Sequence, residues 1–221
     1  MTEFDDFLEK NNIVLSDLQM RQLEQFEQIL IAKNAVMNLV SPKDEPLIRT
    51  RHILDSLAAV PAISKILGRN SAEKSSLRFA DCVSGAGFPG IPLAIAFPEI
   101  RFELFDSQNK RCVFLNESAK AAGISNATAF HARLGEGKPV PVYDIMTERA
   151  MGHLETIMPL CARSLKKGGH FLAWQSAAQV NSVRPEVDKA AKKAHLRPAG
   201  RHSYRIPGEE NDRFILIFVK I

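Results

Sequence analysis

The sequence contains little that would place the protein in a membrane, outside the cell or around a metal ion. Its 221 residues include only three cysteines, Cys82, Cys112 and Cys161. Their odd number and wide spacing match no zinc motif, so we expect reduced core thiols and no bound metal. No apolar run approaches the ~20 residues that cross a bilayer, and the acidic N-terminal segment has no apolar signal-peptide region. We therefore expect a cytoplasmic protein without membrane contact.

The composition is that of a globular protein with unevenly distributed charge. Hydrophobic residues make up 45% of the chain and charged residues 24%, which are ordinary values for a folded protein. We find no internal repeat and no low-complexity tract. Residues 163–205 hold ten Lys or Arg but only two acids, Glu186 and Asp188. Nucleic acid is one partner for such a basic region, although a solvated basic helix explains it equally well.

The segment 77–97 predicts a binding site for a nucleotide-like cofactor. A short apolar run reads as a buried strand, and a second apolar run predicts the helix that follows. Between them, Gly85, Gly87 and Gly90 permit turns that a Cβ would forbid. Asp106 ends the next predicted strand, 21 residues after Gly85. This spacing is close to the ~20 residues at which an acid accepts hydrogen bonds from ribose hydroxyls.

Two cofactors are compatible with this loop. Gly85, Gly87 and Gly90 formally match the G-x-G-x-x-G fingerprint of dinucleotide-binding proteins, so a nicotinamide-dependent reductase is one interpretation. Asp81, at the end of the first strand, favours S-adenosylmethionine, because a carboxylate there can hold the cationic amine of this cofactor. An acid before a glycine loop, followed by a ribose acid on the next strand, resembles the class I methyltransferases.

Strands and helices alternate after residue 77, which predicts an α/β fold. Alternating units give a mostly parallel sheet with helices on both faces, and the last two strands form a hairpin-like antiparallel addition. The seven expected strands are 77–82, 101–106, 127–131, 143–147, 170–175, 202–206 and 214–220. The expected helices between them are 91–97, 111–122, 154–165 and 179–195, the last interrupted at Pro185. We divide the chain into an N-terminal helical extension, 1–70, and a Rossmann-like domain, 71–221.

Caps and hydrophobic spacing predict the helices of the N-terminal extension. The segment from Ser16 to Gln19 is a capping box, and a helix should run from it to about residue 36. A second helix should begin near Asp44. Arg51 and Asp55 lie one turn apart on it, a spacing at which a surface ion pair is as reasonable as a functional role.

Five short motifs are distributed along nearly the whole chain. They are Asn38-Leu39-Val40-Ser41, Arg51-His52-Ile53-Leu54-Asp55-Ser56, Gly85-Ala86-Gly87-Phe88-Pro89-Gly90-Ile91-Pro92-Leu93, Asp106-Ser107-Gln108-Asn109-Lys110-Arg111 and Arg149-Ala150. In this order they resemble the bacterial small-subunit ribosomal RNA guanine-N7 methyltransferases, also known as the glucose-inhibited division protein B family. The second and third motifs are the most specific.

The resemblance implies a class I S-adenosylmethionine-dependent methyltransferase that acts on N7 of one guanine in 16S ribosomal RNA. Guanine N7 has an exposed lone pair, so the reaction needs alignment with the methyl group but no general base. The implied cofactor-binding residues are Asp81, Val83, Gly85, Gly87, Phe88, Asp106, Arg133, Leu134 and Arg149, with Arg133 and Leu134 on the adenine side. The implied catalytic residues, near the RNA and the methyl group, are Asn38, Arg51, His52, Asp55 and Arg149.

The resemblance also implies that the partner is 16S ribosomal RNA or the small ribosomal subunit, and we expect a monomer. Two residues depart from the family pattern, because Val83 replaces a loop glycine and Gln175 replaces a lysine. Val83 cannot readily adopt a positive φ and is expected to crowd the cofactor. Gln175 is expected to hold RNA phosphate more weakly than lysine does. The alternatives are therefore a degenerate relative that binds RNA without catalysis and a methyltransferase with another substrate.

Overall fold

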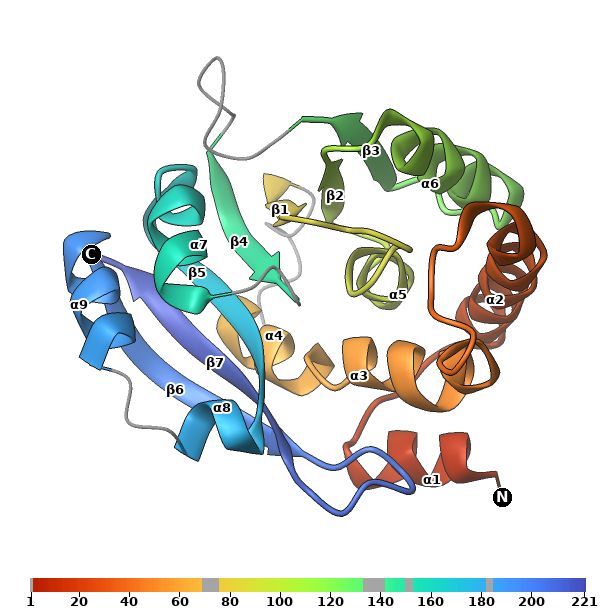
Figure 1. Cartoon of the computed structure of the whole chain (residues 1–221), viewed down its shortest axis with the longest axis horizontal. Coiled ribbons are helices and arrows are strands. Elements are labelled where there is room, and N and C mark those ends of the chain that lie inside the picture. Colours follow the sequence, from red (N-terminus) through yellow and green to blue (C-terminus); the bar gives the residue numbers. More distant parts are fainter. Residues whose placement is uncertain (1, 69–75, 133–141, 150–152, 182–184) are drawn as a thin grey trace.

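A seven-stranded sheet forms the centre of the computed structural model, which describes residues 2–68, 76–132, 142–149, 153–181 and 185–221. The strand order is β3-β2-β1-β4-β5-β7-β6 (Figure 1). The strands are β1 (Arg78–Asp81), β2 (Arg101–Asp106), β3 (Ala127–His131), β4 (Tyr143–Glu148), β5 (Leu165–Ser176), β6 (Leu196–Tyr204) and β7 (Arg213–Lys220). The α/β class and the seven-stranded sheet predicted from the sequence are confirmed.

The first five strands run parallel, and β7 runs antiparallel to both of its neighbours, β5 and β6. The parallel strands require crossover connections, whereas β6 and β7 follow each other directly and can pair as a hairpin. The antiparallel addition predicted for the last two strands is therefore confirmed.

The boundaries of β5 and β6 differ from the prediction. Both strands begin earlier than predicted, β5 at Leu165 and β6 at Leu196. Pairing within the sheet extends β6, since Leu196 lies opposite Lys220 of β7. Pro198 and Gly200 interrupt the pattern that predicts a strand, but they lie at a register shift on an edge strand, where such residues are tolerated.

Helices cover both faces of the sheet and divide the hydrophobic core into two layers. The helices are α2 (Asp17–Met37), α5 (Gly90–Ala96) and α6 (Asn109–Ala121) on the first face, and α7 (Leu154–Ala162) and α9 (Pro185–Lys193) on the second, with α8 (Ala177–Asn181) after β5. Adjacent residues of β1 show the division, because Phe79 packs in the first layer and Ala80 in the second. This alternation is the ordinary consequence of the two-residue period of a strand.

The N-terminal helices pack onto the first face of the sheet. Helix α1 (Glu3–Lys10), which we did not predict, precedes α2, and the predicted Ser16 capping box of α2 is confirmed. The predicted second helix is instead a series of short pieces: a 3-10 turn (Glu45–Leu47), a π-helical turn (Ile48–Ile53), α3 (Leu54–Leu57) and α4 (Val60–Leu67). Phe26 of α2 shares one hydrophobic core with Phe79 of β1, and the division of the chain at residue 70 stays a prediction.

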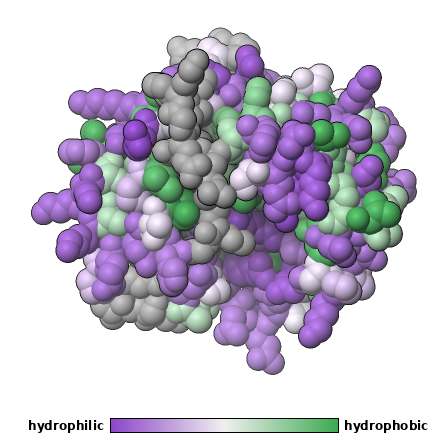
Figure 2. Space-filling view, turned by 45° about the horizontal axis from the view of Figure 1, so that its top comes forward, coloured by the Kyte–Doolittle hydropathy of each residue, from purple (hydrophilic) through white to green (hydrophobic). Residues whose placement is uncertain are grey.

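Hydrophilic residues dominate the face of the molecule seen in Figure 2, where hydrophobic residues form small separate patches. In the described part of the chain, no helix has both the length and the apolar character that a membrane span requires. The large apolar side chain with the greatest exposure there, Val14, lies in the short link between α1 and α2.

Candidate active site at the carboxyl ends of the central strands

Acidic residues end three neighbouring strands at one edge of the sheet. Asp81 ends β1, Asp106 ends β2 and Glu148 ends β4. Because these strands are parallel, their carboxyl ends lie at the same edge (Figure 1). The strand order changes direction between β1 and β4, and ligands of open α/β sheets bind at such a switch point.

The loop after β1 depends on its glycines for two different reasons. Gly85 and Gly87 have positive φ values of 55° and 103°, which side chains with a Cβ rarely adopt. A Cβ at Gly87 would also lie 3.0 Å from the side chains of Ile91 and Phe26. A Cβ at Gly85 would instead meet no described atom within 4 Å. The Gly85 side of the loop therefore borders open space, and the Gly87 side packs against the core.

Asp81 is buried beneath the start of α5. Its Oδ2 accepts a hydrogen bond from the Gly90 N–H at 3.1 Å, and its Oδ1 accepts one from the Thr147 hydroxyl at 3.2 Å. A Cβ at Gly90 would lie 2.7 Å from this Oδ2, so only glycine permits the close approach. Burial raises the pKa of Asp81 to about 6, although these hydrogen bonds oppose the shift.

Asp106 ties the glycine loop to the second strand. Its Oδ2 accepts a hydrogen bond from the Gly85 N–H at 3.0 Å, and its Oδ1 accepts one from the Gln108 N–H at 2.8 Å. Arg111 adds an ion pair at 3.5 Å from the first turn of α6. The carboxylate is thus held in a fixed orientation beside the open side of Gly85.

Phe88, His52 and Arg149 form a stacked group next to the loop. The rings of His52 and Phe88 lie 5.3 Å apart and nearly parallel, and the Arg149 guanidinium lies 5.5 Å from the Phe88 centroid. Arg149 Nη2 donates to His52 Nδ1 at 2.5 Å, which leaves the imidazole proton on Nε2. Burial, reinforced by the Arg149 charge, lowers the pKa of His52 to about 4. His52 is therefore neutral at pH 7.

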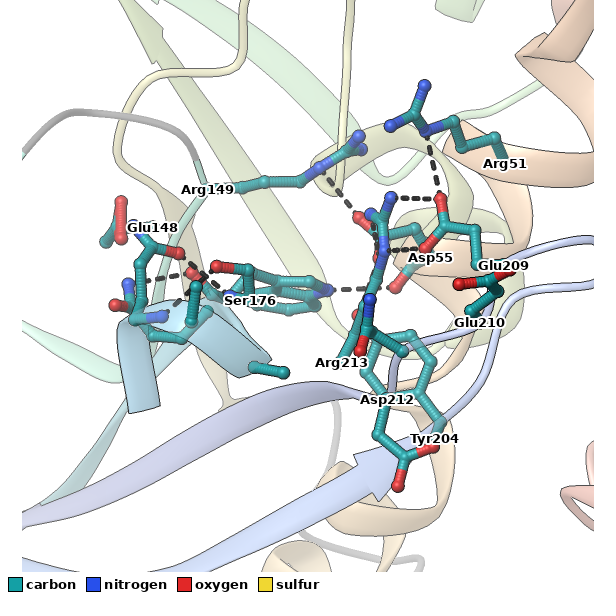
Figure 3. A pocket seen from close by; sticks show the side chains of 16 residues that line it. Arg51, Asp55, Glu148, Arg149, Ser176, Tyr204, Glu209, Glu210, Asp212 and Arg213 are labelled. Atoms are coloured by element: carbon teal, nitrogen blue, oxygen red, sulfur yellow. Dashed lines mark hydrogen bonds and ion pairs between the residues drawn. The ribbon is translucent and has the colours of Figure 1, made fainter. Parts of the chain in front are cut away.

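Asp55 is a buried acceptor for residues from four other parts of the fold. Its Oδ1 accepts hydrogen bonds from the Tyr204 hydroxyl at 2.6 Å and from Arg213 Nη1 at 2.9 Å. Its Oδ2 lies 2.9 Å from Nε of Arg149, and its backbone carbonyl accepts the indole N–H of Trp174 at 2.9 Å. Through its carboxylate and its backbone carbonyl together, Asp55 joins α3 to β5, β6, β7 and the residue that follows β4 (Figure 3).

Arg51 pairs with acids other than Asp55. Its guanidinium lies 2.8 Å from Asp44 and 3.3 Å from Glu209, and Glu209 also binds Arg213. Asp55 is only 1% exposed. The interpretation of Arg51 and Asp55 as a surface i,i+4 pair is therefore wrong, because Asp55 faces the protein interior.

One other predicted site residue that the structure describes, Asn38, is not brought into this group. Asn38 is exposed and ends α2 in the left-handed conformation, with φ 51°. Its backbone N–H closes the helix by donating to Asn34. Arg133 and Leu134 lie outside the described residues.

The two departures from the family pattern have ordinary local environments. In the described part of the chain, the non-glycine residues with positive φ are Asn12, Asn38 and His195. Val83 is not among them, so its backbone does not adopt the positive φ that a valine disfavours, while crowding of a cofactor by its half-buried side chain stays a prediction. Gln175 is buried, and its side-chain amide donates to the Trp174 carbonyl at 2.8 Å.

A cavity of about 910 Å³ opens beside this group (Figure 3). Its walls come from the ends of β4, β5 and β6, the start of β7, the link between β6 and β7, the first residues of α8, and the π-helical turn with α3. The lining residues are Arg51, Asp55, Glu148, Arg149, Trp174, Gln175, Ser176, Ala177, Ala178, Gln179, Tyr204, Glu209, Glu210, Asn211, Asp212 and Arg213. Sequence reasoning missed Glu148, Tyr204 and Arg213, because no local motif marks them.

Comparison with solved structures identifies the fold as that of class I methyltransferases. The Burkholderia thailandensis 1,6-didemethyltoxoflavin-N1-methyltransferase, solved with S-adenosylhomocysteine, superposes with a TM-score of 0.58 at 13% identity, covering 86% of this chain and 87% of that chain. Precorrin-6y C5,15-methyltransferase from Geobacter metallireducens gives a TM-score of 0.51 at 18% identity, covering 75% and 87%. At these identities the likeness shows the fold alone.

Sequence comparison defines the family more narrowly. The GidB family model, described as rRNA small subunit methyltransferase G, matches residues 19–201. The protein named ribosomal RNA small subunit methyltransferase G from Staphylococcus saprophyticus is 37% identical, covering 96% of this chain and 87% of its own. The protein of the same name from Lysinibacillus sphaericus is 32% identical, covering 99% and 90%. The chain belongs to the rRNA small subunit methyltransferase G family.

Proposed function

We propose that this protein transfers a methyl group from S-adenosylmethionine to N7 of a guanine in 16S ribosomal RNA. The observation that carries the proposal is the cavity at the ends of β4 and β5 of a methyltransferase fold, which Arg149 links to the glycine loop because it lines the cavity and lies over the ring of Phe88. Its volume is within the roughly 300–1,000 Å³ of small-molecule sites and suits one nucleotide drawn out of the RNA. We also infer that the protein acts as a monomer in the cytoplasm, where ribosomal RNA is found.

The residues of the loop fit S-adenosylmethionine. The open side of Gly85 offers space next to Asp106. A carboxylate has about four acceptor positions, so Asp106 can accept from ribose hydroxyls while it keeps its bonds to Gly85 and Gln108. Asp81 is buried, and its carboxylate oxygens accept hydrogen bonds from the Gly90 N–H and the Thr147 hydroxyl. We infer that Asp81 acts on the positive end of the cofactor through its charge and by shaping the loop.

The chain's own residues bind and orient the reactants rather than moving a proton. S-adenosylmethionine supplies, when bound, a methyl group on a positively charged sulfur. Guanine N7 attacks with a lone pair that carries no proton, so alignment is the main requirement. His52 is neutral, and its Nδ1 already accepts a hydrogen bond from Arg149. We therefore infer that His52 and Arg149 hold the stacked arrangement with Phe88 in place, and that His52 does not serve as a general base.

Methyl transfer to ribosomal subunits tests the proposal. Small subunits from a strain that lacks the family enzyme are incubated with the protein and methyl-labelled S-adenosylmethionine, and the RNA is digested to nucleosides. We expect label in 7-methylguanosine. Subunits from a strain that has the enzyme are already methylated and should take up no label. Label on another atom or another RNA, or no label at all, would contradict the proposed function.

A further inference from the structure

The link between β6 and β7, residues 205–212, brings acidic side chains to the cavity. Glu209, Glu210 and Asp212 all line it, and Figure 3 shows Glu209 beside two arginines that line it too, Arg51 and Arg213. RNA carries a negative charge on every phosphate, so acids at this place oppose its binding. The contacts of Glu209 give a reason for an acid here.

Glu209 bridges the two arginines. Its Oε1 lies 3.3 Å from Arg51 Nε and accepts a hydrogen bond from Arg213 Nη2 at 2.5 Å, while its Oε2 accepts one from Arg213 Nε at 2.7 Å. Arg213 thus presents two parallel donors to one anion, the geometry in which arginine binds carboxylate and phosphate alike. A phosphate in the place of this carboxylate would meet the same donors.

Both arginines have a second acid that holds them in place without Glu209. Arg51 Nη1 donates to Asp44 at 2.8 Å, and Arg213 Nη1 donates to Asp55 at 2.9 Å. In each guanidinium this nitrogen differs from those that face Glu209. If Glu209 moved away, the Nε of Arg51 and the Nε–Nη2 edge of Arg213 would therefore stay oriented toward a new anion.

The bridge is open enough to solvent for another anion to compete with Glu209. The exposed fraction of the side chain is 27% for Glu209, 38% for Arg51 and 20% for Arg213. Partly exposed ion pairs contribute little to stability. The neighbouring Gly208 borders open space, because a Cβ built on it meets no described atom within 4 Å. The backbone beside Glu209 therefore has room to move when the carboxylate is displaced.

We propose that Arg51 and Arg213 bind a phosphate of the RNA backbone, and that Glu209 occupies this phosphate site until RNA displaces it. The inference rests on the proposed function, since it takes ribosomal RNA as the molecule that enters the cavity. The exchange replaces one anion with another, so both arginines are paired in the free and in the bound protein. Phosphate contacts position an RNA without reading its sequence. Because Glu209 must be displaced first, RNA that offers charge alone binds less well than RNA that also fits the cavity.

Glu209→Gln tests the exchange, and Glu210→Gln is its matched control. Both variants remove one acid from the same link, but Glu209 bridges the arginines whereas Glu210 is an exposed neighbour. Fluorescence anisotropy of the labelled protein gives the Kd for small ribosomal subunits. We expect Glu209→Gln to lower this Kd roughly fivefold, the effect of one ion pair at the upper end of the range for exposed groups, and Glu210→Gln to lower it less than twofold. Equal effects would mean that only the net charge of the link matters, and the proposal would be wrong.

Arg51→Gln, alone and combined with Glu209→Gln, shows whether the two residues act at one site. In the wild-type background this substitution removes a contact to phosphate but also a contact to Glu209 in the free protein, so the net loss of affinity is partial. In the Glu209→Gln background the whole phosphate contact is lost. We therefore expect Arg51→Gln to weaken subunit binding by a factor at least about twofold larger there. The same factor in both backgrounds would place the RNA phosphate elsewhere and overturn the proposal.

Three further measurements separate the alternatives. The Kd for S-adenosylmethionine, measured by calorimetry, should stay within twofold of wild type in Glu209→Gln and shows that this variant is folded. Tighter binding of inorganic phosphate by Glu209→Gln, with unchanged subunit binding, would assign the arginines to a free anion and contradict the RNA assignment. A wild type that methylates subunits while Glu209→Gln binds them no more tightly would overturn this inference alone. A wild type that neither binds nor methylates them would overturn the proposed function as well.

Discussion

At the scale of single residues, Asp55 is a buried acid that two arginines share. Its carboxylate is the shared partner of Arg149 and Arg213, so Asp55→Asn would take this anion from both guanidinium groups and leave Arg213 with Glu209 alone. Breaking such a buried pair costs about 3–5 kcal/mol. We therefore expect a loss of this size in the free energy of unfolding in urea. Asp44→Asn, which removes the more exposed partner of Arg51, should cost about 1 kcal/mol or less. Equal losses in the two variants would contradict the role of Asp55 as the buried partner that Arg149 and Arg213 share.

The lowered pKa of His52 makes the free energy of unfolding depend on pH. Its pKa falls from 6.5 to about 4 on folding, so the unfolded chain binds more protons between these values. Stability must then decrease as the pH is lowered through this range. His52→Gln removes the effect, and between pH 8 and pH 5 we expect the variant to lose about 2 kcal/mol less than the wild type. The opposing contribution of Asp81, whose pKa is raised to about 6, is present in both proteins and cancels. Urea unfolding at the two pH values measures the difference, and identical losses would show that His52 is not buried as a neutral group.

At the scale of secondary-structure elements, the glycines of the β1–α5 loop and of the start of α5 have different roles, one in packing and one in cofactor binding. Gly90→Ala would force a Cβ against the Asp81 carboxylate and the Leu104 side chain, and overpacking of this kind costs about 1–3 kcal/mol. Gly85→Ala would project a methyl group into open space, at a backbone cost of about 1–2 kcal/mol for the positive φ. We expect both variants to lose stability, but Gly85→Ala to weaken S-adenosylmethionine binding more. Thermal unfolding and calorimetry together check this, and an unchanged affinity in Gly85→Ala would place the cofactor elsewhere.

At the scale of the whole molecule, the two lysines that end α9 lie away from the cavity, although other residues of the basic region 163–205 line it. Lys192 and Lys193 end α9 just before the start of β6, whereas Tyr204, at the other end of β6, lines the cavity. The length of β6 separates them by roughly 25 Å at about 3.3 Å per residue. These lysines can therefore contact RNA only at a distance from the reacting base.

This separation predicts a split between binding and turnover. Lys192→Glu combined with Lys193→Glu should raise KM for the small subunit and lower the salt dependence of binding by about one unit of slope per lost phosphate contact. It should leave kcat within about twofold, because uniform binding contributes to KM alone. Lys120→Glu on α6 is the matched control at an exposed position of another helix. A double variant with unchanged KM would show that this region is merely solvated.

The sequence alone determined the features that depend on neighbouring residues. The Ser16 capping box, the glycine turn before α5 and the alternation of strands and helices are local patterns, and the family and enzyme class followed from motifs that the comparisons confirm. Only the tertiary structure decided which distant groups meet. The Asp55 contacts with Tyr204 and Arg213 span well over a hundred positions, and a neutral His52 results from burial beside Arg149. Such contacts depend on how the strands pack in the sheet. The carboxyl edge of the sheet brings together segments that are far apart in the chain, and no local sequence pattern in one segment indicates which other segment it will contact.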